Sequence, residues 1–371
     1  MQNPLMAQAK ETITITGRVL NEIDNRPLVN VNVFIANTML GSATDDDGRF
    51  TIKRVPLGTH ELVFSMVGFE VKKSTLRITS TEDKTVDIKL LPQILKIPEV
   101  EVITTSNNEW QKHLKKFKKY FLGTSKNAEK CKLINAEVLD FSTDSAAEKF
   151  TAKANDILLI ENRSLGYRLF YLLESFTVKK DMVAYFGKIR FNELTPNNQK
   201  EQKRWQKNRL KTYHGSLRHF LATISSKQVT RSGYLRDNGF LVYGMAEFPT
   251  DFSKPDLQEV DIVRLTSPGE LPFERKLHFL NILQVVYTKE MEEREYVYWR
   301  MNYDKSAIRM NTQKRIEAIR PQAQSSWLVM NMVPAIIDVS GYLYNPLAVT
   351  VYGYWAWENV ADLLPVEYTP E

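Results

Sequence analysis

Three consecutive aspartates, Asp45 to Asp47, precede Gly48, and a run of this kind is a candidate for calcium binding. An EF-hand loop places oxygen ligands at positions 1, 3 and 5, glycine at position 6 and a bidentate glutamate at position 12. With Gly48 at position 6, Ala43 falls at position 1 and Arg54 at position 12, so two ligands are missing. Apolar residues alternate after the run, as they do in a strand. The motif therefore predicts a hairpin turn rather than a metal site.

Ser216 and His219 are three residues apart and could suggest a nucleophile with its base. An activated serine also needs an oxyanion hole, typically at a strand-to-helix elbow such as G-x-S-x-G, and this context is missing around Ser216. We interpret Gly215-Ser216 as a helix break in which Ser216 caps the following turn. Arg209, Tyr213, Ser216 and His219 would then form a structural polar network.

Metal and cofactor chemistry has little basis in the remaining residues. None of the five histidines is followed three residues later by glutamate, so the His-x-x-Glu zinc pair of a metallocarboxypeptidase is absent. Cys131 is the one cysteine, which excludes an intramolecular disulfide and a cysteine-based zinc cluster. We therefore expect no catalytic residues, no metal and no cofactor, and we do not expect an enzyme.

Length and composition leave several classes of protein open. The 371 residues allow two domains, and 43% hydrophobic with 25% charged residues is ordinary for a well-packed chain. The net charge of +6 is too small to indicate nucleic-acid binding. No apolar run is long enough to span a bilayer, so we expect no transmembrane segment.

The elements of the first quarter are short strands. Alternating segments such as TITITGRVL, VNVFIANT and RFTIKRV are separated by turn residues about every ten positions, as in a small all-β sandwich. The sequence resembles the carboxypeptidase-regulatory-like domain. The similarity rests on these residues: Gly17, Pro27, Leu28, Val31, Val33, Thr44, Asp45, Asp47, Gly48, Phe50, Pro56, Gly58, Gly68 and Phe69. The resemblance implies an immunoglobulin- or transthyretin-like β-sandwich over residues 12–91.

This family does not imply one function, because such domains accompany peptidases, adhesins and outer-membrane receptors alike. The segment LPQILKIPEVEVITT resembles the strand that follows the domain in TonB-dependent receptors. The remaining residues are too few for the plug and large barrel of such a receptor, so we do not expect a transporter.

The N-terminus indicates export. Ala7-Gln8-Ala9 has small residues at the −3 and −1 positions of a signal-peptidase site. A basic segment and a long apolar core are missing, so we interpret residues 1–11 as the remnant of a signal peptide whose beginning lies upstream of Met1. The alternative is a disordered cytosolic tail.

The second part is predicted to be a linker over 92–107 and a larger β-rich domain over 108–371, with helices near 109–122 and 197–224. Trp110, Leu114, Phe117 and Phe121 are spaced as one apolar stripe of the first helix. We interpret its five lysines, between Lys112 and Lys119, as a solvated face. The alternative is a basic surface for anionic lipid or nucleic acid.

The last aromatic segment is predicted to be a strand that is apolar on both sides. Trp355 and Trp357 would point to one side, and Tyr352 and Tyr354 to the other. Such a strand is either central in a sheet or covered by another surface. Exposed aromatics would instead form a platform on which sugars stack.

Segments such as ENRSLGYRLFYLLESF and WQKNRLKTYHGSLRHFL resemble the part that follows the regulatory-like domain in a group of exported Bacteroidota proteins. That resemblance implies location rather than activity. We expect a mainly β chain with an α+β C-terminal part. Its function would be that of a non-catalytic periplasmic accessory protein, peripheral to the outer membrane, that docks onto an outer-membrane or periplasmic protein. The alternatives are a glycan- or cell-wall-binding module that uses Trp355, Trp357, Tyr352 and Tyr354, and a serine hydrolase.

Overall fold

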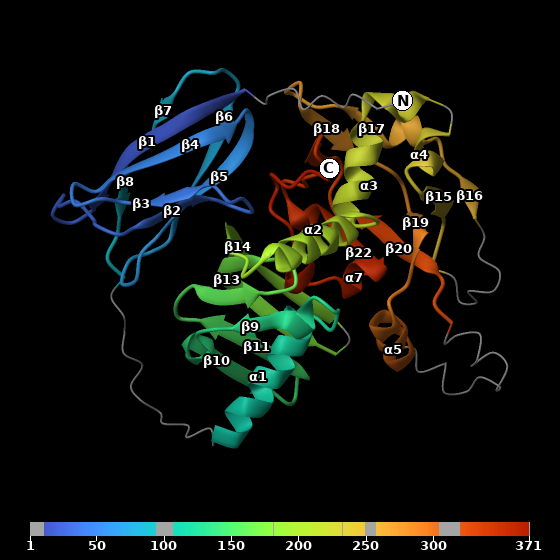
Figure 1. Ribbon diagram of the computed structural model, residues 1–371, viewed down its shortest axis with the longest axis horizontal. Coiled ribbons are helices and arrows are strands. Elements are labelled where there is room, and N and C mark those ends of the chain that lie inside the picture. Colours follow the sequence, from blue (N-terminus) through green and yellow to red (C-terminus); the bar gives the residue numbers. More distant parts are fainter. Residues whose placement is uncertain are drawn as a thin grey trace.

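The computed structural model describes residues 11–93, 107–180, 182–231, 233–248, 257–303 and 320–370. Ala7-Gln8-Ala9 and most of the predicted linker lie outside the described residues. The expected mainly β fold with an α+β C-terminal part is confirmed, since strands make up several antiparallel sheets and helices are few. Figure 1 shows the N-terminal sandwich in blue beside the larger second domain.

The N-terminal domain consists of two sheets packed face to face. One has the order β4-β1-β7, with β8 also paired to β1, and the other has the order β3-β2-β5-β6. Alternating side chains such as Ile15, Val33, Phe50 and Phe64 are buried between the sheets. The strands are β1 (Thr12–Asn21), β2 (Asn32–Ile35), β3 (Gly41–Ala43), β4 (Arg49–Pro56), β5 (Gly58–Ser65), β6 (Lys72–Ile78), β7 (Lys84–Thr85) and β8 (Ile88–Leu90).

The aspartate run forms a tight turn, but the prediction of a hairpin is wrong. β3 pairs with β2 and β4 pairs with β1, so the run carries the chain from one sheet to the other. The Asp45 carboxylate accepts hydrogen bonds from the backbone amides of Asp47 at 3.0 Å and Arg49 at 2.8 Å. Gly48 has φ of 73°. The aspartate side chains thus complete a local turn, whereas strand pairing is decided by packing between distant segments.

We predict that Gly48→Val destabilises the sandwich by about 2 kcal/mol or more, because a β-branched residue resists positive φ. A Cβ atom at this position would also lie 2.6 Å from the Val19 carbonyl oxygen. Thermal melting of the two proteins checks this, and calcium should leave both melting temperatures unchanged. A calcium-dependent rise that disappears in Asp45→Ala would show that the run is a metal site after all.

The second domain begins with helix α1 (Asn107–Phe121) packed on a six-stranded sheet. Leu114, Phe117 and Phe121 from the predicted stripe are buried against this sheet, while most of the lysines are exposed. The sheet has the order β10-β11-β13-β12-β9, with β14 paired to β13. Its strands are β9 (Cys131–Leu133), β10 (Leu139–Asp144), β11 (Lys149–Ala154), β12 (Leu158–Asn162), β13 (Tyr167–Lys179) and β14 (Met182–Glu193).

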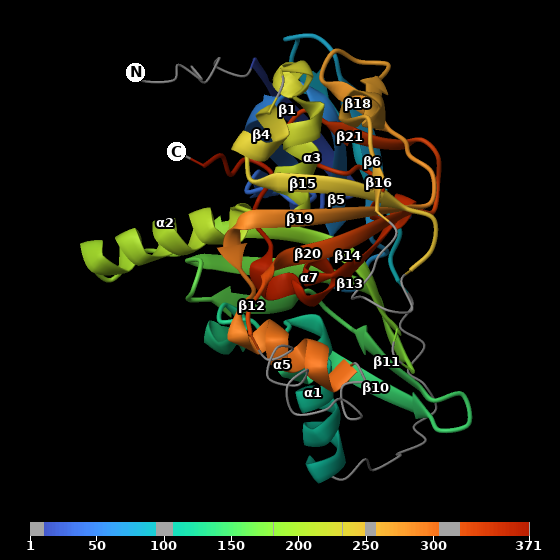
Figure 2. The same cartoon turned by 90° about the vertical axis from the view of Figure 1, so that its right-hand side faces the viewer.

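Helices α2 (Gln199–Tyr213) and α3 (Leu217–Ser225) connect this sheet to the rest of the domain. A five-stranded sheet of order β16-β15-β19-β20-β22 follows, beside a three-stranded sheet of order β17-β18-β21 (Figure 2). These strands are β15 (Phe240–Met245), β16 (Gln258–Glu259), β17 (Thr266–Pro268), β18 (Glu274–Leu277), β19 (Ile282–Met291), β20 (Ala323–Met330), β21 (Ala335–Asp338) and β22 (Val349–Gly353). The other helices are α4 (Tyr234–Asp237), α5 (Arg294–Tyr303) and α7 (Tyr354–Trp357).

Candidate functional site

The C-terminal aromatic segment lies inside the protein, and the prediction of one continuous strand is wrong. β22 ends at Gly353, where φ is 72°, and the chain turns into the short helix α7. Trp355 is 6% exposed and Trp357 is 2% exposed. The Trp355 indole Nε1 donates to the Gly215 carbonyl oxygen at 2.7 Å, and the Trp357 Nε1 donates to Thr124 Oγ1 at 3.0 Å. Both indoles are therefore core residues with satisfied polar groups.

Tyr354 is buried as well, so three of the four predicted interaction residues are corrected to core. Tyr352 remains at the surface with 42% of its area exposed. Its ring packs edge to face on exposed Phe248 at 4.9 Å between centroids. A flat sugar-stacking platform needs several exposed aromatic faces. The burial of both tryptophans removes the residues on which the predicted platform depended.

Ser216 and His219 lie together at the start of α3, but not as a nucleophile and its base. Ser216 is the N-cap: its Oγ accepts from the His219 backbone amide at 3.2 Å and donates to the Tyr213 carbonyl at 2.7 Å. The His219 Nδ1 accepts a hydrogen bond from the Gly215 amide at 3.1 Å. Burial, with His214 and Lys289 nearby, lowers the pKa of His219 to about 3. A neutral imidazole this weakly basic is a poor general base.

Arg209 belongs to a different group of contacts from Ser216 and His219, which corrects the predicted four-residue network. Its Nε donates to the Leu165 carbonyl at 2.7 Å, and its guanidinium lies over the Tyr167 ring at 4.0 Å from the centroid. Its Nη1 also pairs with Glu193 at 2.6 Å. Arg209 therefore holds α2 against the β12–β13 turn instead of reaching α3.

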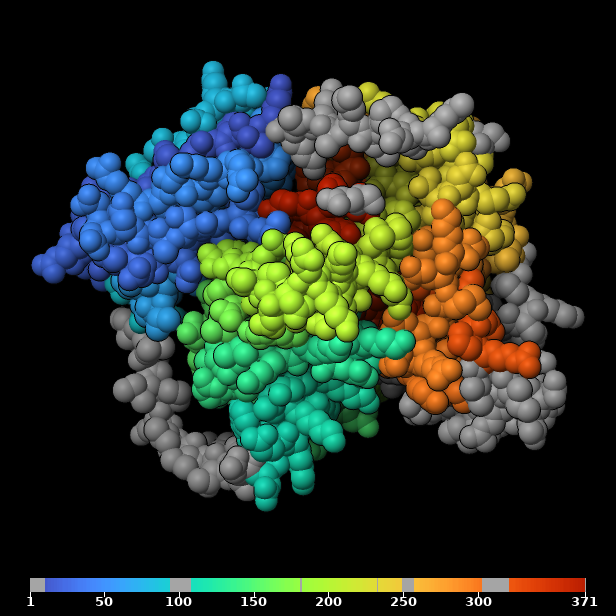
Figure 3. All heavy atoms as spheres, in the orientation of Figure 1, coloured from blue at the N-terminus to red at the C-terminus, as the bar shows by residue number. Residues whose placement is uncertain are grey.

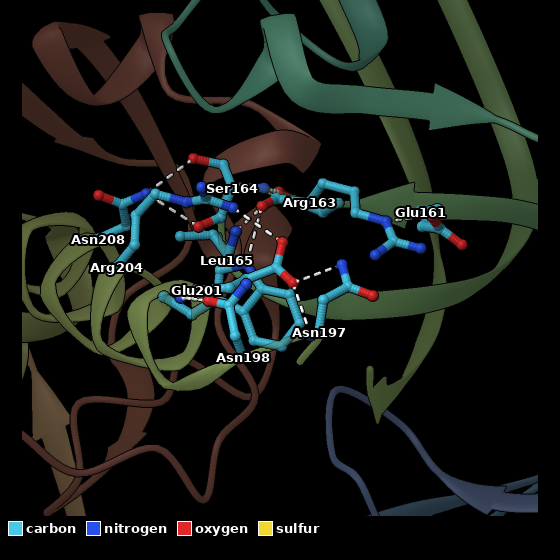
Figure 4. A network of polar contacts seen from close by, with 11 residues as sticks. Glu161, Arg163, Ser164, Leu165, Asn197, Asn198, Glu201, Arg204 and Asn208 are labelled. Carbon is cyan, nitrogen blue, oxygen red and sulfur yellow. Dashed lines mark hydrogen bonds and ion pairs between the residues drawn. The ribbon is translucent and has the colours of Figure 1, made fainter. Parts of the chain in front are cut away.

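The β12–β13 turn is bound to α2 by a network that the sequence did not predict (Figure 4). Trp205 Nε1 donates to the Arg163 carbonyl at 2.9 Å, and Asn208 Nδ2 donates to the Ser164 carbonyl at 2.9 Å. At the start of the helix, Glu201 accepts from the Asn197 backbone amide at 2.8 Å. That hydrogen bond is the main cause of the lowered pKa of Glu201. Because these groups are satisfied by one another, the network fixes α2 rather than forming a reactive site.

The sandwich is packed directly against the six-stranded sheet. Phe34, Ala36 and Val63 on the outer face of its β2–β5 pair are buried, and Leu172 of β13 packs against them. Leu172 alternates along β13 with Tyr171 and Leu173, which belong to the core under α1. The sandwich and α1 therefore cover opposite faces of the same sheet.

Backbone hydrogen bonds join the two domains in addition to this apolar contact. The Asn37 amide donates to the Ile189 carbonyl at 2.6 Å, and the Phe191 amide donates to the Thr38 carbonyl at 2.9 Å. The Val366 amide near the C-terminus donates to the Asn37 carbonyl at 2.9 Å. The β2–β3 turn of the sandwich is thus incorporated into the edge of the second domain.

A cleft of about 800 Å³ runs along this junction. Ion pairs join the two domains at Lys73–Glu174, Arg77–Glu270 and Lys188–Glu61. Figure 3 shows the C-terminal residues in red between the blue sandwich and the yellow-green helices α2 and α3. Residues that line the cleft include Thr59, His60, Glu61, Phe186, Lys188, Tyr342 and Tyr344.

A second, polar pocket of about 350 Å³ lies beside α2 and α7. Its lining includes Glu293, Glu358 and Asp362. Burial raises the pKa of Asp362 to about 6, although Ser125 and Asn127 hydrogen-bond to it. Burial also raises the pKa of Glu358 well above its usual range, and the neighbouring carboxylates add to the shift. Perturbed carboxyl groups in a pocket are a candidate binding site, and no sequence motif predicts this one.

Within the described ranges, no three or more histidine, cysteine, aspartate or glutamate side chains are grouped so that they could bind a metal ion. Over the same residues, no helix has both the length and the apolar character needed to cross a membrane.

The solved structures that resemble this chain do so weakly. A cohesin–X-dockerin complex of Acetivibrio cellulolyticus is 14% identical, covers 31% of this chain and 79% of its own, and gives a TM-score of 0.21. A streptococcal ancillary pilin is 11% identical; the match covers 50% of this chain and 54% of the pilin, with a TM-score of 0.20. The 3-chlorocatechol 1,2-dioxygenase of Rhodococcus opacus is 14% identical; the match covers 23% of this chain and 61% of the dioxygenase, with a TM-score of 0.19. TM-scores of this size do not indicate a common fold for the whole chain.

Sequence comparison is more specific, and it concerns the N-terminal part. The chain is 35% identical over 101 residues to the TonB-dependent receptor P39 of Formosa agariphila. This match covers 27% of the chain and 9% of the receptor, so the chain spans a small part of that relative's length. The model of the CarboxypepD_reg-like domain family matches residues 15–102, which begin within β1 and include all the other strands of the two-sheet sandwich. The N-terminal part of this chain is a CarboxypepD_reg-like domain.

Proposed function

We propose that this chain is a non-catalytic accessory protein of the cell envelope, located in the periplasm and peripheral to the outer membrane. It would bind an envelope protein as one unit formed by both domains. Support for the location comes from the CarboxypepD_reg-like domain and from its similarity to part of a TonB-dependent receptor.

The packing of the two domains supports a single docking unit. The outer face of the β2–β5 pair is occupied by Leu172 within the chain, so this face is not available to a partner. Main-chain bonds from Asn37 and Thr38 to β14 hold the domains in one arrangement. A preorganised unit of this kind loses less conformational entropy on binding than two domains on a free linker.

The surface around Tyr352 is the docking surface that we propose, and its exposed aromatic pair is the observation that carries the proposal. Tyr352 lies directly opposite Trp327 on β20, which in turn lies opposite Gln284 on β19. Residues paired across strands share one face of a sheet, so Tyr352 and Trp327 lie side by side on one face of the five-stranded sheet. Phe248 adds a second exposed ring. Tyrosine and other aromatic residues are enriched at protein interfaces, where they supply a large contact area.

A double substitution of Tyr352 and Phe248 to alanine tests this function. Tagged full-length protein is crosslinked in its native envelope, and the amount of each co-purified protein is measured. We expect loss of about 2 kcal/mol of binding free energy, roughly 30-fold in affinity, because such residues act as hot spots.

The matched control is Tyr298→Ala, which removes another exposed tyrosine, on α5. This variant should co-purify the same protein as the wild type. Equal co-purification by the double variant, or recovery of the wild type in the cytosol, would contradict the proposed function.

A further inference from the structure

A third cavity, of about 390 Å³, lies between the domain-junction cleft and the polar pocket. It shares Lys188, Tyr342 and Tyr344 with the cleft, and Thr212, Glu358 and Asp362 with the polar pocket. The three cavities therefore follow one another through the protein. A volume of this size is within the range that small-molecule sites occupy.

The middle cavity is lined mainly by apolar side chains from four parts of the fold. These include Ile189 and Phe191 of β14, Leu217 and Leu221 of α3, Trp355 of α7 and Leu364. An apolar group that enters this space is removed from water, which is favourable at about 25 cal/mol per Å² of apolar surface. The middle cavity is thus suited to a hydrocarbon chain rather than to a polar molecule.

Glu358 lies in the wall that separates the middle cavity from the polar pocket. The residue is partly accessible because it lines both spaces, but its carboxyl group lies deep in the protein. Among the described residues, none donates a hydrogen bond to this carboxyl group. The charged groups that raise its pKa are Asp362, Glu293 and Glu290, all of them carboxylates. A buried carboxyl group without a partner is unfavourable and is usually compensated by a hydrogen bond or a cation.

Among the described residues, three of the four lysine and arginine side chains that line the polar pocket pair with other groups, and the fourth, exposed Lys130, forms no ion pair with Glu358. Lys211 pairs with Glu293, and Lys126 lies 4.0 Å from Glu295. Arg204 pairs with Glu201 at 2.9 Å. These contacts leave Glu358, with Asp362 beside it, without a cationic partner from the described residues.

We propose that the middle cavity and the polar pocket together bind a small amphipathic amine, with its hydrocarbon part beside Trp355 and its ammonium group at Glu358 and Asp362. An ammonium donates up to three hydrogen bonds and supplies the missing positive charge, so its binding is coupled to release of the proton that burial favours on Glu358. An alcohol of the same length would supply hydrogen bonds without charge, and a carboxylate would add repulsion. This site is separate from the docking surface at Tyr352, so it does not depend on the proposed function.

Hexylamine, hexanol and hexanoate are matched probes for the charge of the head group. Each is titrated into the full-length protein near neutral pH, with melting temperature and calorimetric binding as readouts. A ligand that binds the folded state raises the melting temperature, and at equal concentration the tighter ligand raises it more, because the stabilisation grows with the logarithm of ligand concentration over Kd. We expect hexylamine to bind at least tenfold more tightly than hexanol, and hexanoate to show no binding. Equal binding of amine and alcohol, or preference for hexanoate, would overturn the proposal.

Two variants locate the site. Glu358→Gln keeps the shape of the side chain, and it should reduce the preference for hexylamine over hexanol to less than threefold. Glu137→Gln changes an exposed glutamate outside both spaces, and it should keep the wild-type preference. Unchanged amine preference in Glu358→Gln would show that the amine binds elsewhere. The Tyr352→Ala protein should bind hexylamine like the wild type, which separates this inference from the docking function.

Discussion

Replacing Trp355 with alanine is expected to lower the free energy of unfolding by about 3–5 kcal/mol, the usual cost of truncating a buried tryptophan. The indole is 6% exposed and packs against Phe220 at 5.6 Å between ring centroids. The substitution would also leave the Gly215 carbonyl without its indole donor. Urea denaturation, monitored by circular dichroism, measures the change.

Tyr352→Ala is the matched control for this experiment, since it removes an aromatic ring from the same short segment. Tyr352 is 42% exposed, so its loss should change the free energy of unfolding by less than about 1 kcal/mol. If Trp355→Ala were as stable as Tyr352→Ala, Trp355 would not be a core residue. The prediction that it lies at the surface as an interaction residue would then stand again.

Stability is expected to decrease as pH rises from about 4 through the pKa of the buried acids. Burial raises the pKa of Asp362 from 3.8 to about 6 and that of Glu358 well above 4.5. Over this pH range the folded state retains protons that the unfolded chain releases, so each unit by which the pH rises shifts the equilibrium toward the unfolded state. At about 1.4 kcal/mol per pKa unit, the raised pKa of Asp362 alone should lower the free energy of unfolding by roughly 3 kcal/mol over this pH range.

Glu358→Gln isolates the contribution of Glu358 to this pH dependence. The amide does not titrate, so the difference in unfolding free energy between variant and wild type should grow with pH above about 4.5. Groups with lowered pKa, such as Glu161 and Glu201, have the opposite pH dependence, but they are present in both proteins and cancel in the difference. A difference that is independent of pH between 4 and 8 would show that Glu358 is not buried as described.

The parts of the fold that follow from local residue patterns could be predicted from the sequence. Alternation in the first 90 residues gives the strands of the sandwich, and the stripe of Leu114, Phe117 and Phe121 gives the buried face of α1. The aspartate run gives a turn, because its hydrogen bonds are local. Which strands that turn connects depends on packing between distant segments, and here the hairpin prediction was wrong.

The C-terminal aromatic segment shows a different limit of prediction from the sequence. A segment that is apolar on both sides is compatible with a central strand, a covered strand or a buried helical turn. The predicted strand continues through Gly353, whereas the positive φ of this glycine in the structure ends β22 and starts α7. A glycine within an alternating segment is compatible with a strand and with a break, so the pattern alone does not predict the turn at this position.

The candidate binding site had no local signal at all. Glu358 stands among polar and apolar residues in WAWENVADLL, where a glutamate is ordinarily solvated. Its burial results from the approach of α2, α7 and the β12–β13 turn, which are far apart in the chain. The same is true of Phe34 and Val63, whose outward position in the sandwich becomes interior through contact with Leu172.

Site-specific crosslinking in living cells tests the central claim, docking onto an envelope protein through the surface around Tyr352, most directly. Benzoyl-phenylalanine in place of Tyr352 reports partners of the proposed docking surface, and the same probe in place of exposed Lys132 on β9 serves as the reference position. We predict one discrete crosslinked envelope protein at position 352 and none at position 132. Absence of crosslinks at position 352, or hydrolase turnover by the wild type that Ser216→Ala abolishes without unfolding, would contradict the account.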